Sequence, residues 1–201
     1  MVLANKLNIT DQLELNKAEE KISKQQAKQL FESGKINQIE VGTFYGLAEI
    51  HRFLFGDIYN FAGKLREVNI AKGNFRFASV MYLVQAVDFV SKMPQHNFTQ
   101  IIEKYVEMNI AHPFREGNGR ATRIWLDLIL KKELKQVINW NLVDKNNYLM
   151  AMERSVIKDL EIKQLLQQAL TTQINDRKLF MKGIDISYFY EGYSQFITED
   201  L

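Results

Sequence analysis

The chain has 201 residues, 46% of them hydrophobic, which is enough to bury the core of one domain and argues against a disordered protein. Its 26 basic and 24 acidic side chains leave a net charge of +2, so neither a nucleic-acid-binding nor a membrane-binding surface is indicated. The lack of cysteine excludes disulfides and a thiolate nucleophile, and the first residues lack the apolar core of a signal peptide, so we expect a cytoplasmic location.

Two helices are expected in the first sixty residues. Residues 11–33 are polar and weakly amphipathic, and Gly34 would end this helix. Residues 43–60 carry apolar side chains at helical spacing and should form a core helix. His51 lies beside that apolar stripe, where a histidine is more often structural than catalytic, so we interpret it as structural. We interpret His96 as a loop residue.

A pair of strands is expected within residues 65–79. Apolar and polar residues alternate on both sides of Lys72, Gly73 and Asn74, which supply turn chemistry. The pattern predicts a β-hairpin. It is either purely structural or a flap over a functional site, whose exposed backbone edge could align a segment of another protein by strand addition.

Two helices, over residues 98–111 and 120–134, are expected to flank a short loop. Pro113 lacks a backbone donor and biases His112 away from helical angles, so the first helix should end there. The apolar run IWLDLIL in the second helix is short and is interrupted by Asp127, so we expect no segment that spans a membrane.

The loop between these helices, with the sequence HPFREGNG, favours phosphate binding. Gly117 and Gly119 let a ligand approach the backbone closely, and the free N–H groups at the start of the following helix point at the loop. Arg120 and Arg123 add positive charge at this helix start, where a polyanion would offset its cost.

Two side chains of the loop could carry chemistry. Glu116 can hold a Mg²⁺ that bridges phosphates, and His112 can accept a proton near neutral pH. Neither common nucleotide fingerprint is present, and three scattered histidines without cysteine give no zinc-ligand spacing. The residues therefore indicate a nucleotide-using transferase with a histidine base.

Further helices are expected over residues 80–92, 144–155 and 157–174. A short last helix, over residues 184–192, would stop at Gly192. By itself it resembles a packing helix whose aromatic side chains fill a groove and whose glutamate is solvated.

The stretch HPFREGNGRATR, residues 112–123, resembles the signature of the Fic family, H-x-F-x-[DE]-G-N-G-R-x-x-R, and matches it at every specified position. The resemblance covers roughly residues 30–192. It implies that the chain transfers AMP from ATP to a Tyr, Ser or Thr hydroxyl of a target protein and releases pyrophosphate. Members that phosphorylate instead carry a lysine in the glycine-rich part, where this chain has Gly117 and Gly119.

The resemblance assigns a role to each motif residue. His112 deprotonates the target hydroxyl, Glu116 holds Mg²⁺ between the α- and β-phosphates, and Phe114 anchors the loop in the core. The residues implied to bind the phosphates are Gly117, Asn118, Gly119, Arg120 on the β-phosphate and Arg123 on the γ-phosphate.

Family members place a flap where this chain has its predicted hairpin. The residues Lys72, Gly73, Asn74 and Phe75 resemble the tip of that flap, where it borders the nucleotide. Asn109, one turn before the motif, either faces the same site or is a polar residue on the face of its helix.

Some family members carry an inhibitory helix with the pattern [ST]-x-x-x-E-[GN], which Ser187, Glu191 and Gly192 match. In small stand-alone members this helix is C-terminal. The resemblance implies that Glu191 pairs with Arg123 and keeps it from the γ-phosphate. ATP would then bind with its triphosphate turned away from the in-line geometry that transfer requires.

We therefore expect a mainly α fold, with a single Fic-type helical domain over residues 1–201. Its core should lie at about 30–175, its β-hairpin flap at about 66–79 and its inhibitory helix at about 184–192. The target protein would dock on the flap. Neither direct nucleic-acid binding nor a membrane is expected.

Other functions remain open at this point. Glu191 could orient a water that removes AMP from a modified protein, or the chain could be a nucleotide-responsive interaction module without turnover, although the intact His112 argues against the latter. Self-modification at Tyr188 or Tyr190 is a hypothesis, and a shift between monomer and homo-oligomer is one candidate signal for activation.

Overall fold

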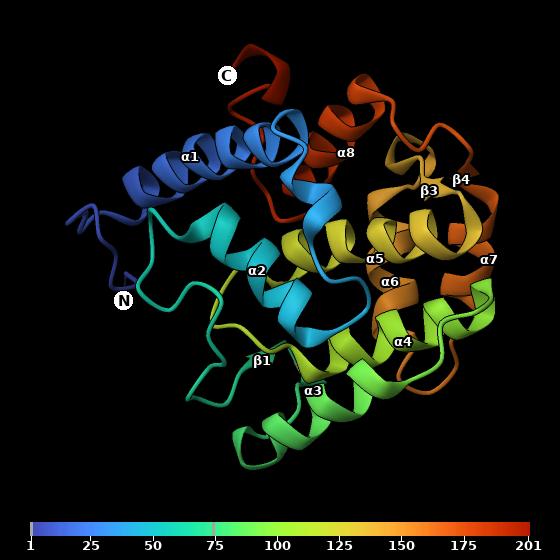
Figure 1. The fold of residues 1–201 in the computed structure, drawn as a ribbon. Helices are drawn as coiled ribbons and strands as arrows, with labels where there is room; N and C mark the ends of the chain where they lie inside the picture. Colours follow the sequence, from blue (N-terminus) through green and yellow to red (C-terminus); the bar gives the residue numbers. More distant parts are fainter. Residues whose placement is uncertain (1, 74) are drawn as a thin grey trace.

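The chain is mainly helical, as expected, and its elements enclose the helix that follows the HPFREGNG loop (Figure 1). The computed structural model describes residues 2–73 and 75–201. The described α-helices are α1 (Gln12–Glu32), α2 (Phe44–Phe55), α3 (Leu83–Lys92), α4 (Phe98–Ala111), α5 (Asn118–Leu134), α6 (Lys145–Arg154), α7 (Leu160–Gln168) and α8 (Arg177–Tyr190). Short 3₁₀ turns are η1 (Lys35–Gln38), η2 (Val80–Tyr82), η3 (Trp140–Leu142) and η4 (Thr198–Asp200).

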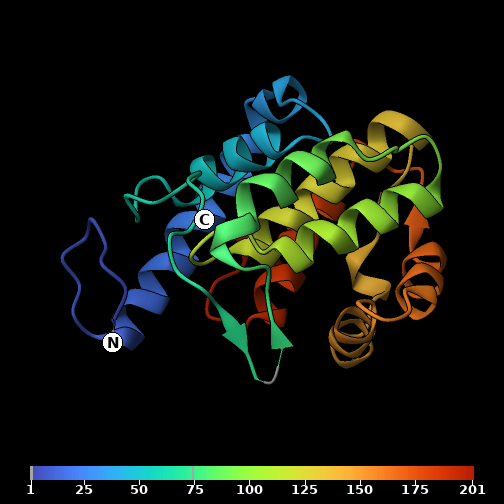
Figure 2. The same ribbon diagram turned by 90° about the horizontal axis from the view of Figure 1, so that it is seen from below.

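The helix α5 occupies the middle of the molecule, between α2, α4 and α8 (Figures 1 and 2). Its apolar side chains face all three neighbours, and a helix that is apolar over most of its circumference must be buried. Its fully buried apolar residues are Ala121, Trp125, Leu126, Ile129 and Leu130. The loop at the start of α5 is consequently held by several elements at once.

The first and last helices of the chain lie side by side, because α1 packs on both α2 and α8 (Figure 1). One ion pair joins them: the buried Lys24 ammonium of α1 contacts the partly exposed Asp185 carboxylate of α8 at 3.0 Å, and it also contacts Glu20 within α1 at 3.0 Å. Residues from both ends of the sequence therefore reach the start of α5.

The strands are shorter than the sequence predicts. The expected hairpin forms, but regular strand is confined to β1 (Ala71–Lys72) and β2 (Phe75–Arg76), with Lys72 opposite Phe75. Asn74 lies outside the described residues. A second antiparallel pair, β3 (Val137–Ile138) with β4 (Leu170–Thr171), was not expected, because strands of two residues are too short to reveal themselves by alternation.

Three helix boundaries also differ from the predictions. The second helix ends at Phe55 rather than at residue 60, because successive turns follow it, and the helix expected over 157–174 ends at Gln168. The last helix begins earlier, at Arg177, because Asp176 caps it with its side chain. No helix in the described part of the chain is long and apolar enough to cross a bilayer.

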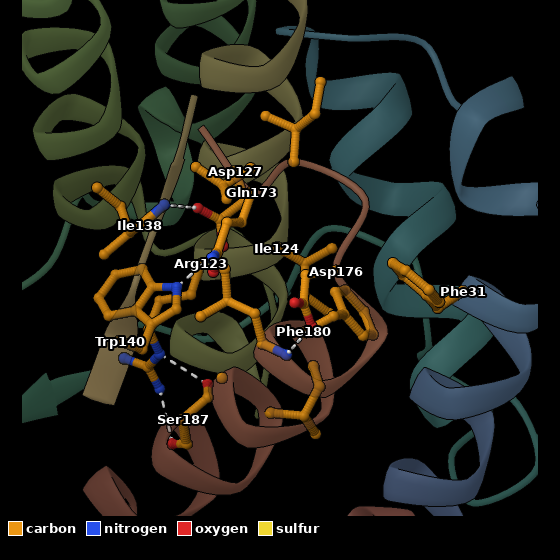
Figure 3. Close-up of a pocket in the computed structure, with 15 residues that line it drawn as sticks. Phe31, Arg123, Ile124, Asp127, Ile138, Trp140, Gln173, Asp176, Phe180 and Ser187 are labelled. Carbon is orange, nitrogen blue, oxygen red and sulfur yellow. Dashed lines mark hydrogen bonds between the residues drawn. The ribbon is translucent and has the colours of Figure 1, made fainter. Parts of the chain in front are cut away.

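A buried carboxylate ties α5 to the segment that supports α8 (Figure 3). Asp127 accepts hydrogen bonds from the backbone N–H of Ile138 at 2.8 Å and from the indole N–H of Trp140 at 2.9 Å. Burial raises the pKa of Asp127 to about 7, and the two donors oppose that rise. The Trp140 ring packs directly against α8, where a side chain at Gly183 would lie 3.2 Å from it.

We expect Asp127→Ala to lower the free energy of unfolding by about 2–5 kcal/mol, because it leaves two buried donors without an acceptor and opens a small cavity. Urea denaturation checks this. The matched control is Asp88→Ala, whose carboxylate is exposed and pairs only with Lys92, and which should change the value by less than about 1 kcal/mol. Equal effects of the two variants would contradict the role of Asp127.

Candidate active site

The predicted helix–loop–helix is confirmed. The helix α4 ends at Ala111 and His112 takes a left-handed conformation with φ of 49°, while α5 begins at Asn118. The Asn118 amide closes the loop, since its oxygen accepts the Phe114 N–H and its nitrogen donates to the Phe114 carbonyl, both at 2.8 Å. Phe114 is fully buried, as expected for a loop anchor.

His51 fixes the same loop from α2. Its ring stacks on Phe114 with centroids 3.8 Å apart, Nδ1 accepts the Gly63 N–H at 2.9 Å, and Nε2 lies 2.8 Å from the Glu116 carbonyl. These partners require the neutral tautomer with its proton on Nε2. Burial lowers the pKa of His51 to about 3. His51 is therefore structural, as interpreted from the sequence, and the part of the structure that it supports is the motif loop.

The two motif glycines leave space that other groups use. Gly117 has a φ of 75°, and a Cβ there would lie 2.6 Å from the Phe55 ring. A Cβ on Gly119 would lie 2.5 Å from a carboxylate oxygen of Glu191 and 3.1 Å from the Arg123 guanidinium. The Glu191 carboxylate thus lies over the first turn of α5, where helix geometry favours an anion.

His112 is poised to accept a proton. Its ring stacks on Phe77, which follows β2, with centroids 3.6 Å apart and planes 15° from parallel. Burial lowers the pKa of His112 to about 4, although the Asn109 carbonyl and the Glu191 carboxylate oppose the change. The imidazole is consequently neutral near pH 7, which is the state a general base needs.

Arg66 joins the hairpin to the end of α4. Its guanidinium donates to the carbonyls of His112 at 2.7 Å, Val68 at 2.7 Å and Ala111 at 3.2 Å. It satisfies carbonyls that the end of a helix leaves without partners. This role could not be predicted, because nothing near Arg66 in the sequence distinguishes it from a surface arginine.

Lys72, in the hairpin, influences the site electrostatically. The Lys72 ammonium lowers the pKa of both His112 and Glu191, although burial is the largest influence on each. Phe75 meets Phe77 edge-on, with ring centroids 5.0 Å apart. Asn109 bridges α4 and α5: its amide nitrogen donates to the Tyr105 carbonyl at 2.8 Å, and its amide oxygen accepts the Thr122 hydroxyl at 3.5 Å.

Glu116 is the loop carboxylate that faces solvent, with 42% of its side chain exposed. Its Oε1 accepts the Gly117 N–H and an Arg120 N–H, each at 3.0 Å. No group of three or more His, Cys, Asp or Glu side chains in residues 2–73 and 75–201 could form a metal site by itself. A single exposed carboxylate beside an anion site fits Mg²⁺, which is commonly held by one or two carboxylates together with phosphate oxygens.

Arg120 is enclosed. Only 1% of its side chain is exposed, and its guanidinium pairs with Glu116 and with Glu19 of α1, to which Tyr59 also donates. Three aromatic rings surround it, those of Phe55, Tyr188 and Tyr193, with the guanidinium carbon 4.9–5.2 Å from their centroids. Glu19 is a residue of this site that the polar pattern of α1 did not reveal.

Arg123 is held by α8 (Figure 3). Its Nε donates to the Ser187 hydroxyl at 2.7 Å, and its Nη2 donates to the Ser187 carbonyl at 3.0 Å and to Glu191 at 3.1 Å. Burial raises the pKa of Glu191, but the charges of Arg123, Arg120 and Lys72 outweigh it and lower the pKa below its usual value. Gly192 follows with a φ of 92° and ends the helix.

A family model described as "Fic/DOC family" matches residues 43–130. The chain is 30% identical to "Protein adenylyltransferase VbhT" of Bartonella schoenbuchensis over 92% of this chain and 40% of that protein. It is 26% identical to "Probable protein adenylyltransferase Fic" of Escherichia coli over 87% of this chain and 90% of that protein. It therefore spans less than half of the first relative and most of the second.

Solved structures share the fold. The BepC protein of Bartonella tribocorum, a VirB-translocated effector with bound AMPPNP, superposes with a TM-score of 0.68 at 17% identity, over 86% of this chain and 94% of that one. The N-terminal Fic domain of a putative cell filamentation protein from Bartonella quintana gives 0.69 at 18% identity, over 90% and 92%.

The neutral state of His51 predicts a loss of stability in acid. Its pKa is lower in the folded protein than in the unfolded chain, so the unfolded chain takes up protons first as the pH falls below about 6.5. Between about pH 7 and pH 5 this should remove about 2 kcal/mol of unfolding free energy.

Urea denaturation should show that loss to be smaller by the same amount in His51→Gln than in the parent protein. The exposed His96 provides the control, because His96→Gln should keep the parent's pH dependence; an unchanged slope in His51→Gln would refute the assignment.

Proposed function

Because this chain belongs to the Fic/DOC family, we propose that it is a protein adenylyltransferase, which moves AMP from ATP to a hydroxyl side chain of a target protein. The observation that carries this proposal is a neutral His112 on the loop that leads into α5, whose first turn offers backbone N–H groups suited to phosphate. Names of relatives that match most of this chain support the same activity.

In the proposed reaction His112 takes the proton from the target hydroxyl as its oxygen attacks the α-phosphorus. A phosphorus–oxygen bond to the target forms, the bond to the β-phosphate oxygen breaks, and pyrophosphate leaves. The free N–H groups in the first turn of α5 face the phosphates, and Arg123 takes the γ-phosphate once it is free. Glu116 would hold Mg²⁺, which supplies positive charge to the phosphates when bound.

We propose that α8 inhibits this reaction. Glu191 places a negative charge over Gly119, where phosphate should bind, and keeps Arg123 engaged together with Ser187. A charge-assisted hydrogen bond of this kind is worth roughly 1.5–3 kcal/mol, or about 10- to 150-fold in an equilibrium. ATP could bind under these conditions, but not in the geometry that transfer needs.

The target segment would align along the backbone of the hairpin, where β1 is exposed on both of its residues. Self-modification at Tyr188 or Tyr190 requires α8 to leave its place, because both side chains are buried and the Tyr190 hydroxyl donates to the Val143 carbonyl at 2.6 Å. Mass analysis after incubation with ATP should therefore find neither tyrosine modified while α8 stays docked.

A second activity, removal of AMP, is favoured by the charge of Glu191 near His112. The Glu191 carboxylate lies close enough to His112 to raise its pKa, so it could orient a water toward a bound AMP–protein bond while His112 returns a proton to the leaving hydroxyl. Release of AMP from a modified target by the parent protein, and its loss in Glu191→Gly, would support this activity. No release from either protein would refute it.

We expect Glu191→Gly to raise AMP transfer by about 10- to 150-fold, because it frees Arg123 and the start of α5. Incubation with α-labelled ATP and Mg²⁺ in cell lysate measures this as a labelled protein band. His112→Ala, added to Glu191→Gly, should abolish the label, and Glu161→Gly, which removes an exposed carboxylate paired with Arg154, should match the parent protein. ATP binding without any label in the Glu191→Gly lane would favour a nucleotide-responsive module without turnover.

A further inference from the structure

Two carboxylates share the guanidinium of Arg120. Glu19 reaches it from α1 and Glu116 from the motif loop, and neither the Arg120 nor the Glu19 side chain is more than 2% exposed. The Tyr59 hydroxyl donates to the other oxygen of Glu19 and fixes its orientation. The buried Glu19 carboxylate, which is oriented by Tyr59, therefore holds the buried Arg120 guanidinium in place.

The charges of this group decide what Glu116 can bind. Arg120 and Glu116 alone would form a neutral pair. An arginine that pairs only with Glu116 neutralises that carboxylate and so weakens its attraction for any other cation. Glu19 adds a second negative charge on the far side of the guanidinium. The three side chains together then carry one net negative charge, which is located at the only exposed member, Glu116.

The hydrogen bonds of Glu116 use only one of its two carboxylate oxygens in the described part of the chain. The Gly117 N–H and Arg120 both bind Oε1, at 3.0 Å each. In the part of the chain that the structure describes, no hydrogen bond reaches Oε2. One oxygen is therefore fixed by the protein, and the other is presented to solvent beside the start of α5.

We propose that Glu19 is a positioning residue for the metal–nucleotide complex: by neutralising and fixing Arg120, it leaves Glu116 oriented and negatively charged for Mg²⁺. This inference rests on the proposed function and adds α1 to the functional unit. Outer partners of metal ligands act in this way, because they orient the ligand and set its charge.

The same geometry argues against a free Arg120. To reach a β-phosphate, its guanidinium would have to leave Glu19 or Glu116 and the three rings that surround it. Loss of Arg120 would also leave the buried Glu19 carboxylate without its cationic partner. Arg120 is thus a support that stays in place. Arg123 is equally buried, but its carboxylate partner Glu191 is 25% exposed, so Arg123 is the arginine whose partner is exchanged under the proposed function.

Calorimetry separates a metal-site role from a general loss of structure. AMPPNP is titrated into Glu191→Gly protein once with excess Mg²⁺ and once with a chelator, and the ratio of the two affinities reports the contribution of the metal. We expect Glu19→Gln, added to Glu191→Gly, to lower this ratio by about 10-fold or more, toward the value for Glu116→Ala, with little change in the metal-free affinity. Glu19→Asp, which keeps the charge, should recover part of the ratio.

Glu20→Gln is the matched control. Glu20 lies next to Glu19 on α1 and is equally buried, but it pairs with Lys24 and does not contact Arg120. It should keep the ratio of Glu191→Gly, even if its melting temperature falls as much as that of Glu19→Gln. A loss in both Glu19→Gln and Glu20→Gln would mean that α1 acts only through stability, which overturns the inference.

Two other results would also overturn it. An unchanged ratio in Glu19→Gln would show that Glu116 needs no support from α1. Tighter metal-free binding in Glu19→Gln would show that Glu19 restrains Arg120 from the phosphates. If Glu191→Gly bound no AMPPNP in either titration, the proposed function itself would fail, and that outcome is distinct from the other two.

Discussion

The structure depends on how positive charge is balanced at the start of α5. The free N–H groups of the helix and two arginines meet there in a largely buried place, and such charge is stable only with anions close by. In this conformation carboxylates supply them: Glu19 and Glu116 on Arg120, and Glu191 on Arg123. Under the proposed function, a nucleotide takes the geometry that transfer needs by replacing Glu191, the carboxylate that lies at the end of its helix and has 25% of its side chain exposed.

This balance explains why the ends of the chain pack together. The helix α1 brings Glu19 and α8 brings Ser187 and Glu191 to consecutive turns of α5, and the Lys24–Asp185 pair joins the two outer helices. The supports differ in kind. Glu19 is enclosed and pairs with a buried arginine, whereas Glu191 lies where α8 ends and is partly exposed.

The residues themselves predicted what is local, the family resemblance supplied the distant pair of Arg123 and Glu191, and two other distant contacts were missed. The loop, its two flanking helices and the burial of Phe114 follow from residues within one stretch, and the structure confirms them. Glu19 and Arg66 lie far along the chain from the residues they hold, and no spacing rule connects them to the loop. The strand pair β3–β4 was missed for the opposite reason, since two residues carry no pattern.

The pKa of His112 also depends on the negative charge at the start of α5. Burial against Phe77 keeps the imidazole neutral, but a pKa of about 4 also makes it a weak base. Glu191 already raises that pKa with a single charge. A triphosphate brings more negative charge to the same place, so its binding raises the pKa of His112 further and strengthens the base. Under the proposed function, the exchange of Glu191 for nucleotide would therefore free Arg123 and prepare His112 in a single event.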